Sequence, residues 1–157
     1  MHEHLTKFIP AMRFKHPCAL LVAGSTGTGK SNFVKNIIEC DGIEGDIKSI
    51  YYFMPRLEPI EVAPAQHQHL YLMEGLPSQD WVDDTFPVEK DSKSMIVIDD
   101  LWSACIENDV CEYLLTYGRR HLGVSLVFVA QNFYEKAKKA ITYRYLQNIY
   151  QQYITFI

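Results

Sequence analysis

The chain has 157 residues, of which 48% are hydrophobic, 22% charged and 13% aromatic. This length fits one domain around one hydrophobic core, and the aromatic content argues against disorder along the whole chain. The formal net charge of -4 does not indicate a generally basic nucleic-acid binder, and no apolar run reaches the ~20 residues that a membrane span needs.

After a leader of residues 1–16, apolar runs and turn residues alternate along the first half of the chain. Short apolar runs predict strands, and apolar residues at helical spacing predict a helix. Ser78 can serve as the N-cap of a short helix. The prolines within residues 54–68 exclude a long regular element there. We expect strands at 17–23, 47–53 and 70–73, a helix from Ser31 to about residues 41–42, and a short helix at 77–81.

In the second half, the continuous apolar run at 95–98 is typical of a central parallel strand, and we expect another buried strand at 124–130. Between them, apolar residues at 110, 113, 114 and 117 share one helix face, which Asn108 or Asp109 can begin and Gly118 can end. We also expect a short basic helix or loop at 133–140 and a last strand at 149–157. Alternating strands and helices predict a single α/β domain, a sandwich with a mostly parallel sheet.

The segment after the first expected strand reads Gly-Ser-Thr-Gly-Thr-Gly-Lys-Ser and matches G-x-x-x-x-G-K-[ST]. Glycines let backbone N–H groups approach phosphate oxygens, and the start of a helix favours an anion. Lys30 can reach the β- and γ-phosphates of a nucleotide, and the Ser31 hydroxyl can ligate magnesium. The predicted ATP-binding residues are Gly24, Ser25, Thr26, Gly27, Thr28, Gly29, Lys30 and Ser31.

Two carboxylates, Asp99 and Asp100, follow the apolar run at 95–98. Ligands of open α/β sheets bind beyond the carboxyl ends of the strands. We expect Asp99 to hold Mg²⁺, directly or through water, and Asp100 to act as general base on the attacking water. Many NTPases carry Glu at the position of Asp100, and Asp is shorter by one methylene.

Gln131 follows the expected strand at 124–130, where an amide can sense the γ-phosphate or orient the water; a helix cap is the alternative. Arg119 and Arg120 precede that strand, and a guanidinium can stabilise the charge of a transferring phosphoryl group. If subunits form a ring, either arginine could act on the neighbour's nucleotide. A solvated turn or a patch for DNA phosphates is the alternative for both.

Other polar residues point less clearly to chemistry. A late basic group could contact a nucleic-acid backbone or form a solvated helix face; it comprises Lys136, Lys138, Lys139 and Arg144. Two histidine pairs, at 2 and 4 and at 67 and 69, lack an identifiable third metal ligand in the sequence. We interpret them as surface residues. The cysteines at 18, 40, 105 and 111 form no CxxC pair, so we expect free thiols in a reducing compartment rather than a zinc site.

Taken together, these motifs resemble a known family. The segments that carry the likeness are His16-Pro17 and the glycine-rich loop, Glu74–Pro77, Ile96–Leu101 and Tyr117–Asn132. They are similar to the genome-packaging ATPases of large and mid-sized eukaryotic DNA viruses, including poxviruses, and of Polinton (Maverick) transposons, in the FtsK–HerA branch of P-loop ATPases. The likeness runs from about residue 14 onward, and it is loose over residues 143–152.

The resemblance implies a P-loop NTPase that hydrolyses ATP with Mg²⁺ and translocates double-stranded DNA into a capsid. It implies a homo-oligomeric ring, a capsid or portal protein as partner, and an intracellular location in the host nucleus or viral factory and in the virion. It also implies that the strand at 124–130 lies between the strands bearing the loop and the acid pair. A small nucleoside or nucleotide kinase and a domesticated, non-hydrolysing nucleotide binder are the alternatives.

Overall fold

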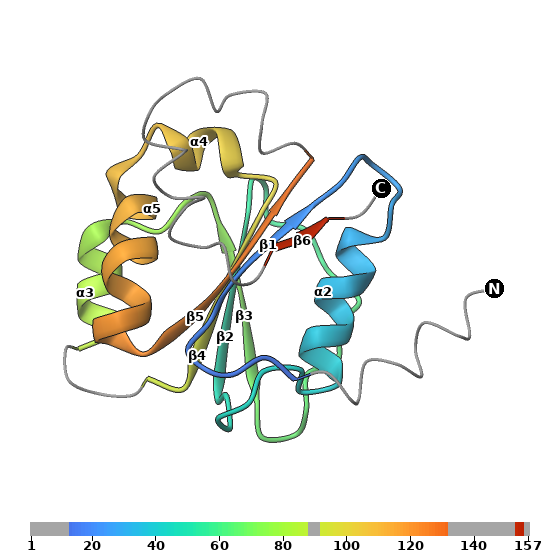
Figure 1. Ribbon diagram of the computed structural model, residues 1–157, viewed down its shortest axis with the longest axis horizontal. Helices are drawn as coiled ribbons and strands as arrows, with labels where there is room; N and C mark the ends of the chain where they lie inside the picture. The colour runs from blue at the N-terminus through green and yellow to red at the C-terminus, as the bar shows by residue number, and fades with distance from the viewer. Residues whose placement is uncertain (1–12, 88–91, 132–152, 156–157) are drawn as a thin grey trace.

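The computed structural model describes residues 13–87, 92–131 and 153–155 of the chain. Its strands form one sheet in the order β3-β2-β4-β5-β1-β6, and every pairing within these ranges is parallel (Figure 1). The strands are β1 (Ala19–Ala23), β2 (Ser49–Met54), β3 (His69–Glu74), β4 (Ser94–Asp99), β5 (Val124–Ala130) and β6 (Tyr153–Thr155).

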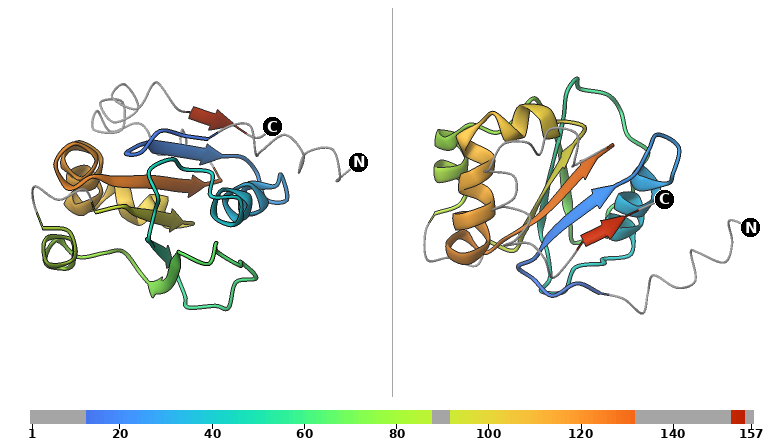
Figure 2. Two further views of the ribbon diagram at one scale, coloured as in Figure 1. Left: turned by 90° about the horizontal axis from the view of Figure 1, so that it is seen from below. Right: turned by 45° about the horizontal axis from the view of Figure 1, so that its top comes forward.

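Helices cover both faces of this sheet. They are α2 (Lys30–Glu39), α3 (Gln79–Thr85), α4 (Trp102–Ile106), α5 (Asp109–Tyr113) and the π-helix η2 (Leu114–Leu122). Figure 1 shows α2 on one side of the sheet and α3, α4 and α5 on the other, and the turned views of Figure 2 keep the two groups apart. The expected α/β architecture with a parallel sheet is confirmed, and the arrangement is consistent with a three-layer sandwich.

The two faces of the sheet bury different side chains because successive strand residues point in opposite directions. On β1, Leu20 and Val22 pack in the cluster that contains Val34 and Ile37 of α2. Leu21 of the same strand packs in the other cluster, with the helices of the opposite face. The strand β5 is buried along its whole length, which confirms the buried strand expected at 124–130.

Most element boundaries agree with the sequence to within a few residues. Ser78 caps α3 as expected, because its hydroxyl accepts a hydrogen bond from the Trp81 backbone N–H at 3.1 Å. Asn108 caps α5 in the same way, accepting from the Val110 N–H at 2.9 Å. The histidines at 67 and 69 are exposed, as interpreted.

The expected end of the second-half helix is wrong. Gly118 lies inside η2, and the helical segment ends instead at Gly123, whose φ of 63° is left-handed. Leu122 is fully buried in the core, so packing of this side chain favours one more turn beyond Gly118. The left-handed conformation that ends a helix is one that glycine adopts without a Cβ penalty.

Several expectations fall outside the described residues. They concern most of the leader, the basic segment 133–140 with Lys136, Lys138, Lys139 and Arg144, and the parts of the last strand that flank β6. Among the helices of the described ranges, none combines the length and apolar character that a bilayer span requires.

Candidate functional site

Three neighbouring strands bring the predicted site residues to one edge of the sheet. The strand β5 pairs with β1 on one side and with β4 on the other, with Ala23 opposite Ala130 and Asp99 opposite Val129. The carboxyl ends of these strands are therefore aligned. The glycine-rich loop follows β1, Gln131 follows β5, and Asp99 ends β4 with Asp100 directly after it.

The segment 24–31 forms a tight turn that leads directly into α2. Gly27 and Gly29 have φ values of 83° and 97°, a region that side chains other than glycine rarely adopt. Between them, the backbone N–H and the hydroxyl of Thr28 both donate to the Ser25 carbonyl, at 3.3 and 2.8 Å. Gly29 caps α2 without a side-chain hydrogen bond, so the first turn presents backbone N–H groups and the positive end of the helix dipole.

The Lys30 side chain folds back over this turn. Its ammonium group donates to the carbonyl oxygens of Gly24 at 2.5 Å and Ser25 at 2.7 Å. An ammonium group has three donor hydrogens, so this anchoring uses two of them. The positive charge is thus held at the mouth of the loop, directly beside the start of α2.

A pocket of about 440 Å³ opens over the loop and the acid pair. This volume falls in the range of small-molecule sites, roughly 300–1,000 Å³. The predicted site residues that line it are Thr26, Gly27, Gly29, Lys30, Ser31, Asp99, Asp100 and Gln131. Gly24, Ser25 and Thr28 contribute instead to the hydrogen bonds that shape the turn and anchor Lys30.

Asp99 is partly buried and Asp100 is exposed. Burial raises the pKa of Asp99; the hydrogen bond from Tyr52 lowers it, the neighbouring Asp100 raises it and Lys30 lowers it, with a net upward shift. Asp100 has a left-handed backbone with φ of 56°, and its N–H donates to the Val129 carbonyl at 3.1 Å. The turn after β4 is thereby tied to β5.

The backbone of Arg119 and Arg120 lies far from this pocket. Both lie in η2, which ends just before β5 begins, so they are at the amino edge of the sheet. The seven residues of β5 span about 20 Å at ~3.3 Å per residue, and Gln131 lies at the far end. The side chains of the two arginines are outside the described part of the chain, and their role stays a prediction.

Two residues near the site were not predicted from the sequence. Asn32 lines the pocket from the first turn of α2, and its position directly after Ser31 was an available signal. Tyr52 donates a hydrogen bond from its hydroxyl to Asp99 Oδ2 at 2.6 Å. These two residues are 47 positions apart, and no local pattern predicts which tyrosine of β2 faces the acid pair. Burial raises the pKa of Tyr52.

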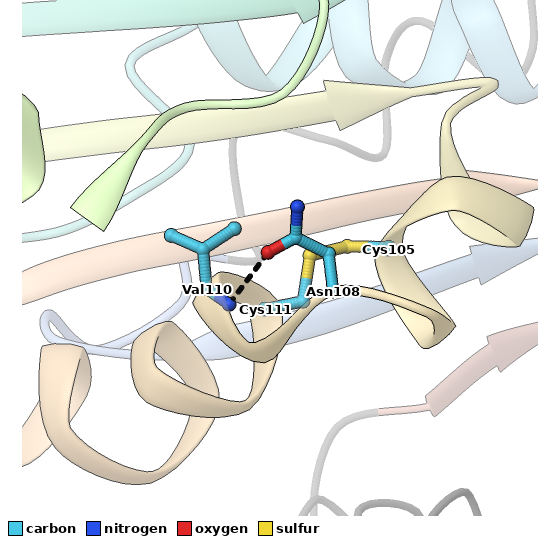
Figure 3. Close-up of a disulfide and its surroundings, with 4 residues drawn as sticks. All are labelled: Cys105, Asn108, Val110 and Cys111. Atoms are coloured by element: carbon cyan, nitrogen blue, oxygen red, sulfur yellow. Dashed lines mark hydrogen bonds between the residues drawn. A yellow bond between two sulfur atoms is a disulfide. The ribbon is translucent and has the colours of Figure 1, made fainter.

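The segment that follows the acid pair carries a disulfide. Cys105 of α4 and Cys111 of α5 are bonded, next to the Asn108 cap of α5 (Figure 3). Both residues are buried in the core. The expectation of free thiols is therefore wrong for this pair, because the short turn between the two helices brings the side chains together. Cys18 and Cys40 remain thiols.

No protein-family model matches this chain, and the comparison with curated proteins gives no match. Within the described ranges, no group of three or more His, Cys, Asp or Glu side chains is arranged to hold a metal ion. Magnesium is usually held by one or two carboxylates together with substrate phosphates and waters. The donor set of Ser31 and Asp99 fits that kind of site.

Proposed function

We propose that this protein is a P-loop ATPase that hydrolyses ATP with Mg²⁺ and uses the energy to translocate double-stranded DNA into a capsid. The observation that carries the proposal is the convergence, in one pocket, of the glycine loop with Lys30, the acid pair and Gln131. The placement of β5 between β1 and β4 supports it further, because it agrees with the strand arrangement that the resemblance implies.

Each part of the pocket suits one part of the reaction. The N–H groups at the start of α2 and the Lys30 ammonium bind the phosphates. Ser31 and Asp99 would hold Mg²⁺, which neutralises phosphate charge when bound. Asp100, exposed at the pocket wall, takes a proton from the attacking water, and the Gln131 amide orients that water or contacts the γ-phosphate.

The assembly and the location belong to the same proposal. The backbone of Arg119 and Arg120 lies at the opposite edge of the sheet from Gln131. A contact between either arginine and the phosphates therefore has to come from another subunit, as it would in a ring. The DNA substrate, the capsid or portal partner and the site of action in the host nucleus or viral factory and in the virion follow from the family resemblance.

One observation favours a second candidate, a small nucleoside or nucleotide kinase. A cavity of about 340 Å³ lies beside the main pocket, shares Asp99 and Asp100 with it and includes Arg56. Such a cavity has room for an acceptor. Its lining contains one arginine and three carboxylates, Asp99, Asp100 and Glu58. This excess of negative charge disfavours a phosphorylated acceptor. We therefore prefer hydrolysis.

The deciding experiment measures phosphate release from ATP with Mg²⁺, with and without double-stranded DNA, beside a mass measurement of oligomers. The proposal expects Mg²⁺-dependent hydrolysis, stimulation by DNA and a multimer. Phosphate transfer to a nucleoside, with release that DNA leaves unchanged, would support the kinase. Nucleotide binding without turnover would support the non-hydrolysing binder.

A further inference from the structure

We infer that Tyr52 is a positioning residue that orients the Asp99 carboxylate for its metal ion. The inference rests on the proposed function, since it assigns Asp99 to magnesium. The observation behind it is the hydrogen bond from the Tyr52 hydroxyl to Asp99 Oδ2 at 2.6 Å. That length is typical of a hydrogen bond from a hydroxyl to an ionised carboxylate.

The tyrosine is itself held firmly. Tyr52 is only 5% exposed and packs in the cluster on the α2 side of the sheet. Its backbone pairs with Val97 of β4, two residues before Asp99. The phenol ring therefore runs alongside the end of β4, and its hydroxyl reaches the carboxylate from a rigid strand.

The orientation of the Asp99 carboxylate is not fixed by its own backbone position or side-chain torsion. Asp99 is the last residue of β4, and the chain turns directly afterwards through the left-handed Asp100. The terminal torsion of an aspartate side chain is broad and has no strong preference of its own. The hydrogen bond engages Oδ2, which restricts rotation of the carboxylate and leaves Oδ1 as the oxygen for a second ligand.

Partners of this kind matter for metal binding in general. Removing a hydrogen-bond partner of a metal ligand typically weakens metal affinity by 10- to 100-fold, because the ligand is no longer pre-oriented. Tyr52 does not line the main pocket, whereas it does line the smaller cavity, which shares Asp99 and Asp100 with the main pocket. We therefore assign it no contact with the nucleotide and an effect on the metal only.

The test compares Tyr52→Phe with Tyr51→Phe. Both variants lose one hydroxyl from β2 and keep the aromatic ring. Tyr51 packs with the cluster on the other face of the sheet, where its ring stacks on Tyr71 with centroids 5.1 Å apart. It is thus a matched control that leaves Asp99 untouched.

The readout is the affinity for a fluorescent ATP analogue, titrated with Mg²⁺ and repeated in EDTA. For Tyr52→Phe, we expect the Mg²⁺ concentration that gives half of the affinity gain to rise about 10- to 100-fold, with metal-free affinity unchanged. Tyr51→Phe should match the wild type in both measurements. In a double-mutant cycle, Tyr52→Phe should add nothing to Asp99→Asn, because both act on one metal contact.

Three outcomes are distinguishable. A wild-type protein that binds no nucleotide, or binds it without dependence on Mg²⁺, would overturn the proposed function. A wild type that depends on Mg²⁺ and a Tyr52→Phe variant with the same Mg²⁺ dependence would overturn the positioning role alone. Loss of metal-free affinity in Tyr52→Phe, together with a lower unfolding midpoint, would assign the tyrosine to the fold and likewise overturn the inference.

Discussion

The backbone N–H of Gly24 donates a hydrogen bond to the carbonyl oxygen of Ala130 at 3.3 Å. Gly24 is the first residue of the glycine loop, and Ala130 is the last residue of β5, directly before Gln131. The glycine loop and Gln131, which follows the neighbouring strand β5, are thus connected through main-chain hydrogen bonding. Their relative position depends on the sheet itself, and side-chain substitutions in the pocket can be expected to change chemistry while leaving this frame intact.

Replacing Lys30 with alanine should abolish ATP turnover. The substitution removes the ammonium group that is held at the mouth of the loop by the Gly24 and Ser25 carbonyls. A hydrogen bond to a charged group contributes about 1.5–3 kcal/mol, so we expect nucleotide affinity to fall roughly 10- to 100-fold, measured by calorimetry. Lys35→Ala is the control, because Lys35 lies on the same helix and pairs with Glu39 at 3.8 Å. Full activity of Lys30→Ala would refute the site.

Asp100→Asn should separate binding from hydrolysis. The amide has nearly the same size as the carboxylate and tolerates the left-handed backbone at this position, while it cannot accept a proton from water. General-base catalysis typically contributes 10²- to 10⁴-fold, and we expect kcat to fall by about that factor with Mg²⁺-nucleotide affinity retained. Equal losses of affinity and turnover would show instead that Asp100 helps to bind the nucleotide.

Mixing two inactive variants tests the arginines. If Arg119 or Arg120 acts on a neighbouring subunit, combining Arg119→Ala or Arg120→Ala subunits with Asp100→Asn subunits should restore part of the ATPase activity. The mixed ring contains some sites with both an intact base and an intact arginine. No recovery for either arginine, in mixtures shown by mass to exchange subunits, would count against action between subunits.

Removing the disulfide should lower stability. A bond between cysteines six residues apart restricts the unfolded chain by about 2 kcal/mol in the loop-entropy model. We expect Cys105→Ala/Cys111→Ala to show that loss in urea unfolding, and a reductant to destabilise the wild type and leave the double variant unchanged. Cys40→Ala is the control, since Cys40 is an exposed thiol. A wild type insensitive to reductant would contradict the prediction.

Tyr113 should ionise at a higher pH than an ordinary tyrosine. Burial and the hydrogen bond to Asp83 at 2.8 Å raise its pKa to about 12, from an ordinary value near 10. The folded state therefore holds this proton more tightly than the unfolded state does, so the associated stability is complete below pH ~10 and is lost as the pH rises towards 12. Absorbance at alkaline pH, with Tyr113→Phe to assign the signal, measures the pKa, and Asp83→Asn should lower it.

Local patterns predicted the strands, the glycine loop and the caps at Ser78 and Asn108, because these depend on residues adjacent in the chain. Long-range features were not accessible in the same way. The bond between Tyr52 and Asp99 depends on the register of two strands, and the extension of η2 past Gly118 depends on how Leu122 meets the core. The disulfide depends on the turn between two short helices. Each is a property of packing rather than of a motif.

The left-handed backbone at Asp100 gives a reason for the shorter acid at this position. Aspartate and asparagine adopt that conformation more readily than longer side chains do, and the hydrogen bond from the Asp100 N–H to Val129 holds the turn in place. A glutamate would extend the carboxylate by one methylene towards the pocket and would strain or reshape the turn. If Asp100 is the proposed base, its reach and the main-chain geometry are therefore set by the same residue, and an attempt to lengthen this acid would have to redesign the end of β4 with it.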